Sequence, residues 1–99
     1  MRESLPSFLR LRVITEARLL VDEEVDSVML PSLEGYLGIL PGHRPLLVAL
    51  GEGFLTFQVQ KKEKKYHVEG GYAEITADKV LVYTKLIEDG DSEKIKEKG

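Results

Sequence analysis

Short runs in which apolar and polar residues alternate dominate this chain. In the stretch "FLTFQVQ", Leu55, Phe57 and Val59 fall on one face and the polar residues between them fall on the other. This alternation is typical of a half-buried antiparallel strand. The stretch "KYHVEG" repeats it and places His67 on the outward face, as an exposed residue of the sheet. The lysine-rich "KKEKK" between the two runs predicts an exposed hairpin tip.

Similar runs occur along most of the chain. They are "FLRLRVIT", "EVDSVML", "LLVAL" and "KVLVYTK", and the turns between runs are predicted at "DEE", "GEG", "EGG" and "TADK". This spacing predicts an all-β fold, a two-layer antiparallel β-sandwich of roughly ten short strands. We expect the sandwich to span 8–90, after an N-terminal extension at 1–7. The tail at 91–99 is polar and is either frayed or the start of a short helix.

Composition narrows the possible partners. A chain of 99 residues forms one domain, and 0 Cys excludes disulfides, cysteine-based metal sites and a thiol nucleophile. A net charge of −3 provides no basic field that would attract nucleic acid. We find no apolar stretch long enough for a signal peptide or a membrane span, so we expect no direct membrane insertion. The partner is therefore expected to be a protein or a small molecule.

The stretch "EGYLGILPGHRPLL" at 34–47 is the strongest candidate for a functional element. It lacks the Gly-Lys-Ser/Thr ending of a phosphate-binding loop, and neither His43 nor His67 belongs to a pattern with metal-ligand spacing. The serines occur in no nucleophile context. We therefore expect no catalytic residue, no cofactor and no metal ion.

The backbone of this stretch explains it without chemistry. Leu40 to His43 fits a type II turn, in which Pro41 fixes φ and Gly42 accepts a positive φ. Arg44 precedes Pro45 and is therefore biased toward an extended conformation. Such a loop loses little conformational entropy on binding. The sequence thus predicts a pre-shaped docking loop with His43 as a contact residue.

The spacing Gly35-x-x-Gly38-x-x-Pro41-x-His43-x-Pro45 is followed by "GGYAEI" at 70–75 and "VLVYT" at 80–84. Together these motifs resemble the epsilon subunit of F-type ATP synthase, called delta in mitochondria. The resemblance to that family's N-terminal β-sandwich domain covers about Phe8 to Asp91.

The resemblance implies a non-catalytic rotor subunit in the central stalk, which links the gamma subunit to the polar loops of the membrane c-ring in proton-driven ATP synthesis. In a bacterium it would be peripheral, on the cytoplasmic face of the inner membrane. The interface candidates that the resemblance implies are Glu34, Tyr36, His43 and Arg44. The residues expected to shape turns are Gly35, Gly38, Pro41, Gly42, Pro45, Gly70 and Gly71.

Two further expectations remain open. Family members usually continue into a C-terminal helical hairpin, whereas this sequence ends at Gly99, so we expect that hairpin to be either naturally absent or truncated. The main alternative function is a generic β-sandwich module that binds protein or carbohydrate through the "GYLGILPGH" loop. With 0 Trp and 3 Phe, the chain is poor in the aromatic platforms that bind sugars.

Overall fold

The alternating runs form β-strands throughout the part of the chain that the computed structural model describes, residues 6–88. Those residues contain eight strands and no helix. The strands are β1 (Leu9–Ile14), β2 (Leu19–Val25), β3 (Ser27–Ser32), β4 (Gly35–Ile39), β5 (Leu46–Ala49), β6 (Glu52–Val59), β7 (Lys62–Ile75) and β8 (Lys79–Glu88). The all-β prediction is confirmed. The predicted tail at 91–99, with its possible helix, lies outside the described residues.

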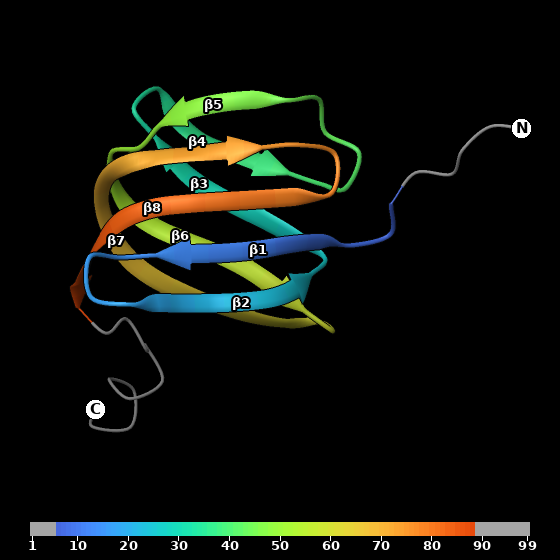
Figure 1. Cartoon of the computed structure of the whole chain (residues 1–99), viewed down its shortest axis with the longest axis horizontal. Coiled ribbons are helices and arrows are strands. Elements are labelled where there is room, and N and C mark those ends of the chain that lie inside the picture. The colour runs from blue at the N-terminus through green and yellow to red at the C-terminus, as the bar shows by residue number, and fades with distance from the viewer. Residues whose placement is uncertain (1–5, 89–99) are drawn as a thin grey trace, which may run out of the picture.

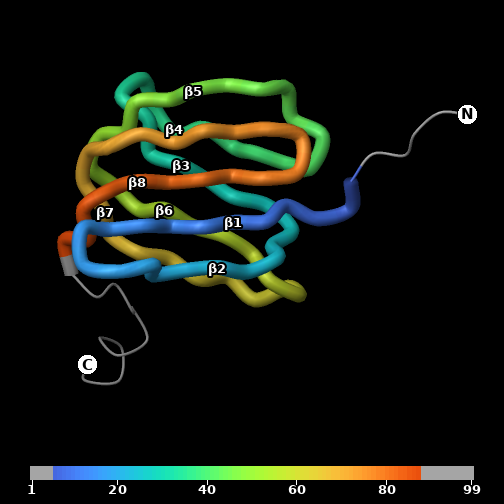
Figure 2. Tube along the Cα trace, in the orientation of Figure 1, coloured from blue at the N-terminus to red at the C-terminus, as the bar shows by residue number. Residues whose placement is uncertain are grey.

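All eight strands belong to one hydrogen-bonded sheet that folds over into two layers (Figure 1). The strand order is β2-β1-β8-β7-β6-β3-β4, and β5 pairs with β7. One layer contains β2, β1, β5, the N-terminal part of β8 and the C-terminal half of β7. The other contains the C-terminal part of β8, the N-terminal half of β7, β6, β3 and β4. Figure 2 shows β7 and β8 turning from one layer into the other without a break. The pairing is antiparallel except between β1 and β8.

The bend in β7 occurs at two glycines with positive φ, Gly70 at 73° and Gly71 at 93°. The pairing of β7 with β8 shifts register between Glu69 and Tyr72, which marks a bulge. A Cβ atom on Gly71 would lie 1.8 Å from the carbonyl oxygen of Tyr83. "EGG" is therefore not a turn between strands. The structure has eight strands rather than roughly ten, because β7 and β8 each run through both layers.

The core lies between the layers and consists of the inward-facing residues of each strand. The predicted face of β6 is confirmed, since Leu55 is 0% exposed and Phe57 is 1% exposed. β1 alternates in the same way, with Leu9, Leu11 and Val13 all 0% exposed. Among the described residues, no polar or charged residue is buried. Burial of apolar surface, at about 25 cal/mol per Å², is therefore the main term that holds the layers together.

Two predicted boundaries were wrong. The hairpin between β6 and β7 turns at Gln60 and Lys61, with φ of 51° and 69°, and the remaining lysines of "KKEKK" lie in β7. Two successive residues with positive φ are the signature of a type I′ turn, which matches the twist of the strands. "DEE" is also not a turn but part of β2, where Asp22 faces outward opposite Arg12.

A third expectation also needs correction. The stretch at 34–47 was predicted to be a docking loop throughout, but Gly35–Ile39 forms strand β4 and pairs with β3. The period-two pattern is hard to detect in β4, because two of its five residues, Gly35 and Gly38, have no side chain that could mark a position as apolar or polar. Outside the strands, the stretch contributes only Glu34, in the turn before β4, and the loop at 40–45 between β4 and β5.

Candidate docking surface

The turn between β3 and β4 presents Leu33 and Glu34 to solvent. Gly35 closes the turn with φ of 118°. The Ser32 hydroxyl donates to the Gly35 carbonyl oxygen at 2.5 Å and accepts from the Glu34 amide at 3.1 Å. The Leu33 amide donates to the Ala49 carbonyl at 3.1 Å, which fastens the turn to β5. The turn is therefore held rigidly while the Leu33 side chain remains 70% exposed.

Tyr36 lies across the outer face of its layer and reaches β6. Its hydroxyl oxygen accepts a hydrogen bond from the Phe54 amide at 3.0 Å. The hydroxyl sits over Gly53, where a Cβ atom would come within 2.5 Å of it. The absence of a side chain at Gly53 therefore leaves room for the Tyr36 hydroxyl. The sequence offered one signal of this role, since a glycine inside a strand often marks a close approach by another group.

Phe54 and His67 continue this surface across β6 and β7. Their ring centroids are 5.0 Å apart, and the Lys65 Nζ atom lies 5.1 Å from the centroid of Phe54. The Glu52 carboxylate accepts a hydrogen bond from His67 Nε2 at 2.9 Å. Phe54 is 43% exposed and Tyr36 is 54% exposed. We call Tyr36, Phe54 and His67 the aromatic row. Of these three residues, sequence reasoning predicted Tyr36 as an interface residue and His67 only as an exposed residue of the sheet.

The loop at 40–45 adopts the predicted type II geometry. Gly42 has φ of 92°, and the His43 amide donates to the Leu40 carbonyl at 3.2 Å. The Gly42 amide donates to the Ala77 carbonyl at 2.8 Å, which ties the loop to the turn between β7 and β8. His43 Nδ1 donates to the Arg44 carbonyl at 2.7 Å, since a carbonyl oxygen can only accept.

The four predicted interface residues do not form one site. Glu34 and Tyr36 lie near the start of β4, whereas His43 and Arg44 follow its end. A five-residue strand spans about 13 Å from its first to its last Cα atom. The structure therefore separates the predicted interface residues into two groups, one at each end of β4.

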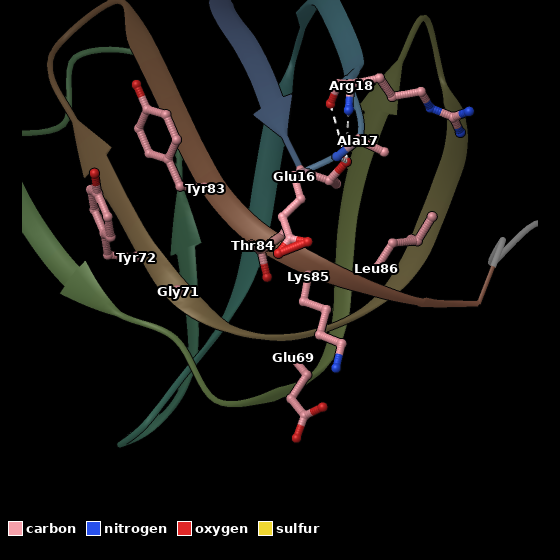
Figure 3. A pocket seen from close by; sticks show the side chains of 11 residues that line it. Glu16, Ala17, Arg18, Glu69, Gly71, Tyr72, Tyr83, Thr84, Lys85 and Leu86 are labelled. Carbon is pink, nitrogen blue, oxygen red and sulfur yellow. Dashed lines mark hydrogen bonds between the residues drawn. The ribbon is translucent and has the colours of Figure 1, made fainter.

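The opposite layer carries a hollow of about 650 Å³ beside the bend in β7. Figure 3 shows Tyr72 of β7 next to Tyr83 of β8, with the turn between β1 and β2 across from them. The two tyrosine rings have centroids 5.0 Å apart. The rim carries both signs of charge, including Arg18 and Lys85 with Glu69. Sequence reasoning did not find this hollow, because its walls come from β7, β8 and the turn between β1 and β2, which are separated in the sequence.

On the same outer face, Asp22 accepts hydrogen bonds from Arg10 at 2.8 Å and from Arg12 at 3.2 Å. These two hydrogen bonds hold the pKa of the Asp22 carboxyl below its ordinary value of 3.8. The aspartate is solvated, so this cluster is a surface ion-pair network. The ion pairs explain why the acidic segment "DEE" can form part of strand β2. The outward-facing arginines of β1 lie directly opposite its acids and balance their charge.

Two kinds of feature are absent from residues 6–88. These residues bring together no group of three or more histidine, aspartate or glutamate side chains that could hold a metal ion. The same residues contain no helix that is long and apolar enough to cross a membrane. Exposed aromatic side chains with fixed positions, a rigid loop and a rim of mixed charge are instead the features of protein interfaces.

Comparison with known proteins points to one family. Residues 8–90 match the family model "ATP synthase, Delta/Epsilon chain, beta-sandwich domain". The ATP synthase epsilon chain of Solibacter usitatus is 44% identical over 84 residues, covering 85% of this chain and 63% of that protein. That of Carboxydothermus hydrogenoformans is 39% identical over 83 residues, covering 84% of this chain and 62% of that protein. The chain thus spans about three fifths of the length of these relatives.

Solved structures show the same fold. A chain of the Euglena gracilis mitochondrial ATP synthase, from a structure of OSCP/F1/c-ring, superposes with a TM-score of 0.80 at 23% identity, covering 99% of this chain and 65% of that chain. A chain from the central stalk/c-ring structure of the Tetrahymena thermophila mitochondrial ATP synthase gives 0.66 at 15% identity, covering 83% of this chain and 75% of that chain. Sequence match and fold agree: the chain belongs to the ATP synthase delta/epsilon-chain family and carries its beta-sandwich domain.

Proposed function

We propose that this chain is a non-catalytic rotor subunit of an F-type ATP synthase. In this role the sandwich binds the gamma subunit and rests on the polar loops of the c-ring, so that rotation driven by proton flow passes between them. In a bacterium it would act at the cytoplasmic face of the inner membrane, as a peripheral subunit. The observation that carries the proposal is the family match over 8–90, which spans every strand of the sandwich.

The geometry of the surface supports this role in two ways. A subunit between two moving partners needs separate contact regions, and the two ends of β4 carry Glu34 and His43 on different turns. It also needs rigid contacts, because flexible ones would absorb motion rather than transmit it. The loop at 40–45 is held at both sides, by its own turn hydrogen bond and by the bond from Gly42 to Ala77.

Co-purification tests the proposal directly. The chain is expressed together with the gamma subunit from the same organism, and the mixture is separated by gel filtration. We expect a stoichiometric complex that survives the column. If gamma elutes alone at micromolar concentrations of both proteins, the rotor function is excluded.

His43→Ala tests the loop as an interface. We expect the variant to fold as the wild type does, because His43 is only partly buried and its ring hydrogen bond is local. Its docking to gamma or to the c-ring should weaken by at least about tenfold, which corresponds to about 1.4 kcal/mol. Glu16→Ala, at an exposed position of the turn between β1 and β2, at the other end of the sandwich from this loop, is the matched control. Loss of cooperative unfolding in His43→Ala would instead make His43 a structural residue.

A further inference from the structure

The edges of β4 and β5 leave one side of the sandwich open. Among the described strands, β4 pairs only with β3, and β5 pairs only with β7. A groove of about 440 Å³ runs between them and is lined by Leu37 and Leu46, among others. Leu46 faces inward, on the same side of β5 as the buried Val48, yet it is 42% exposed. A core-facing leucine is thus left uncovered at this edge.

The backbone of β4 has hydrogen-bonding groups directed at this open edge. The Pro31 carbonyl accepts from the Gly51 amide at 2.8 Å and therefore points away from β4. Tyr36, which lies opposite Pro31, is then a non-hydrogen-bonded position of the antiparallel pair. Its amide and carbonyl point outward, and by alternation so do those of Gly38. The edge of β4 thus presents two N–H and two C=O groups in the spacing of a strand.

The edge strands β2 and β4 differ in their protection. The edge strand β2 carries Asp22, Glu23 and Glu24 in succession, and charge on an edge strand discourages pairing with another chain. β4, with the sequence "GYLGI", carries no charged residue and no proline. Gly38 also has no side chain to shield its amide. Such an edge is a template for an added strand.

We propose that β4 is extended by a strand of the partner subunit. The occupant is an extended, uncharged segment of the gamma subunit that pairs with Tyr36 and Gly38 through its backbone and places alternate apolar side chains over Leu37 and Leu46. This inference rests on the proposed rotor function, because it assigns part of the interface with the same partner. It accounts for the exposed Leu46, which the added strand would cover.

Amide hydrogen exchange in the complex tests the inference without any substitution. In the free chain, the amides of Tyr36 and Gly38 should exchange rapidly, while that of Leu37, bonded to β3, is protected. On binding gamma, exchange at Tyr36 and Gly38 should slow by at least about tenfold. If the complex forms and these two rates do not change, strand addition is wrong and the rotor function stands. If no complex forms, both fall. Protection that depends on concentration without gamma would make the occupant a second copy of this chain.

Two pairs of variants separate backbone pairing from side-chain contact. Gly38→Pro removes the outward amide and Gly38→Ala keeps it, so only the proline should weaken gamma binding, by at least about tenfold. Leu46→Asn should weaken binding, whereas Leu19→Asn should not, since Leu19 is exposed to a similar degree, 50% against 42%, but lies on β2. Equal binding by Gly38→Pro and Gly38→Ala, both folded by circular dichroism, would overturn the proposal.

Discussion

Replacement of Gly71 by alanine tests the bend on which the two-layer arrangement depends. The residue has φ of 93°, and its added Cβ atom would lie 1.8 Å from the Tyr83 carbonyl oxygen, where real contacts stay above 3.0 Å. A left-handed conformation costs an L-residue about 1–2 kcal/mol. The collision is with backbone, so β7 and β8 must separate by about 1 Å, which weakens ladder hydrogen bonds worth about 1 kcal/mol each. Together these terms predict a loss on the order of 3–5 kcal/mol.

Two other glycines serve as graded controls. Gly70→Ala has open space around it but φ of 73°, so it should cost only the backbone term of about 1–2 kcal/mol. Gly38→Ala would place its Cβ atom in ordinary contact with the Met29 side chain, 3.9 Å from Cε, and Gly38 has no positive φ. It should therefore be neutral or stabilise by up to about 1 kcal/mol. The assay is equilibrium unfolding in urea, followed by far-UV circular dichroism. Equal losses for Gly70→Ala and Gly71→Ala would show that the close approach of β8 does not determine the bend.

Three further predictions concern single side chains. Phe57→Ala should destabilise the domain by about 3–5 kcal/mol in urea, because it empties a site that is 1% exposed. The pKa of Asp22 is lowered in the folded state, mainly by its hydrogen bond from Arg10. The Asp22 carboxylate should therefore stabilise the fold fully at pH 7, and this stabilisation should disappear as the pH falls through the folded pKa, below 3.8. Urea unfolding of the wild type and of Asp22→Asn over this pH range measures the effect, and a difference in stability that persists at the lowest pH contradicts the prediction. Tyr36→Phe should cost about 1 kcal/mol, the value of its bond to the Phe54 amide, and should speed exchange of that amide.

The period-two pattern predicted the core faces of β1 and of the second half of β6 because the inward residues from Leu9 to Val13 and from Leu55 to Val59 are all large apolar side chains. The same reasoning failed where the pattern was interrupted. The acids of β2 indicated a turn, since their partners Arg10 and Arg12 lie on another strand and are visible only in the pairing. Glycines hid β4 for a different reason, namely that they remove the side chains from which a period is detected.

The candidate site could be predicted only in part. Pro41 and Gly42 encode their turn locally, so the loop geometry follows from the sequence. The aromatic row does not, because Tyr36 meets Phe54 across an intervening strand and His67 joins from the other side. Contacts of this kind depend on strand order and register, neither of which adjacent residues specify. Resemblance to a family supplied the functional direction that local patterns could not.

The continuity of the sheet has a mechanical consequence. In a sandwich made of two separate sheets, a load on one layer reaches the other through side-chain packing, and the layers can slide. Here β7 and β8 belong to both layers, so a sideways load passes along covalent backbone and through hydrogen bonds that share it in parallel. A body built this way twists as one piece. In the rotor role proposed above, that stiffness would limit how much rotation is lost within the domain.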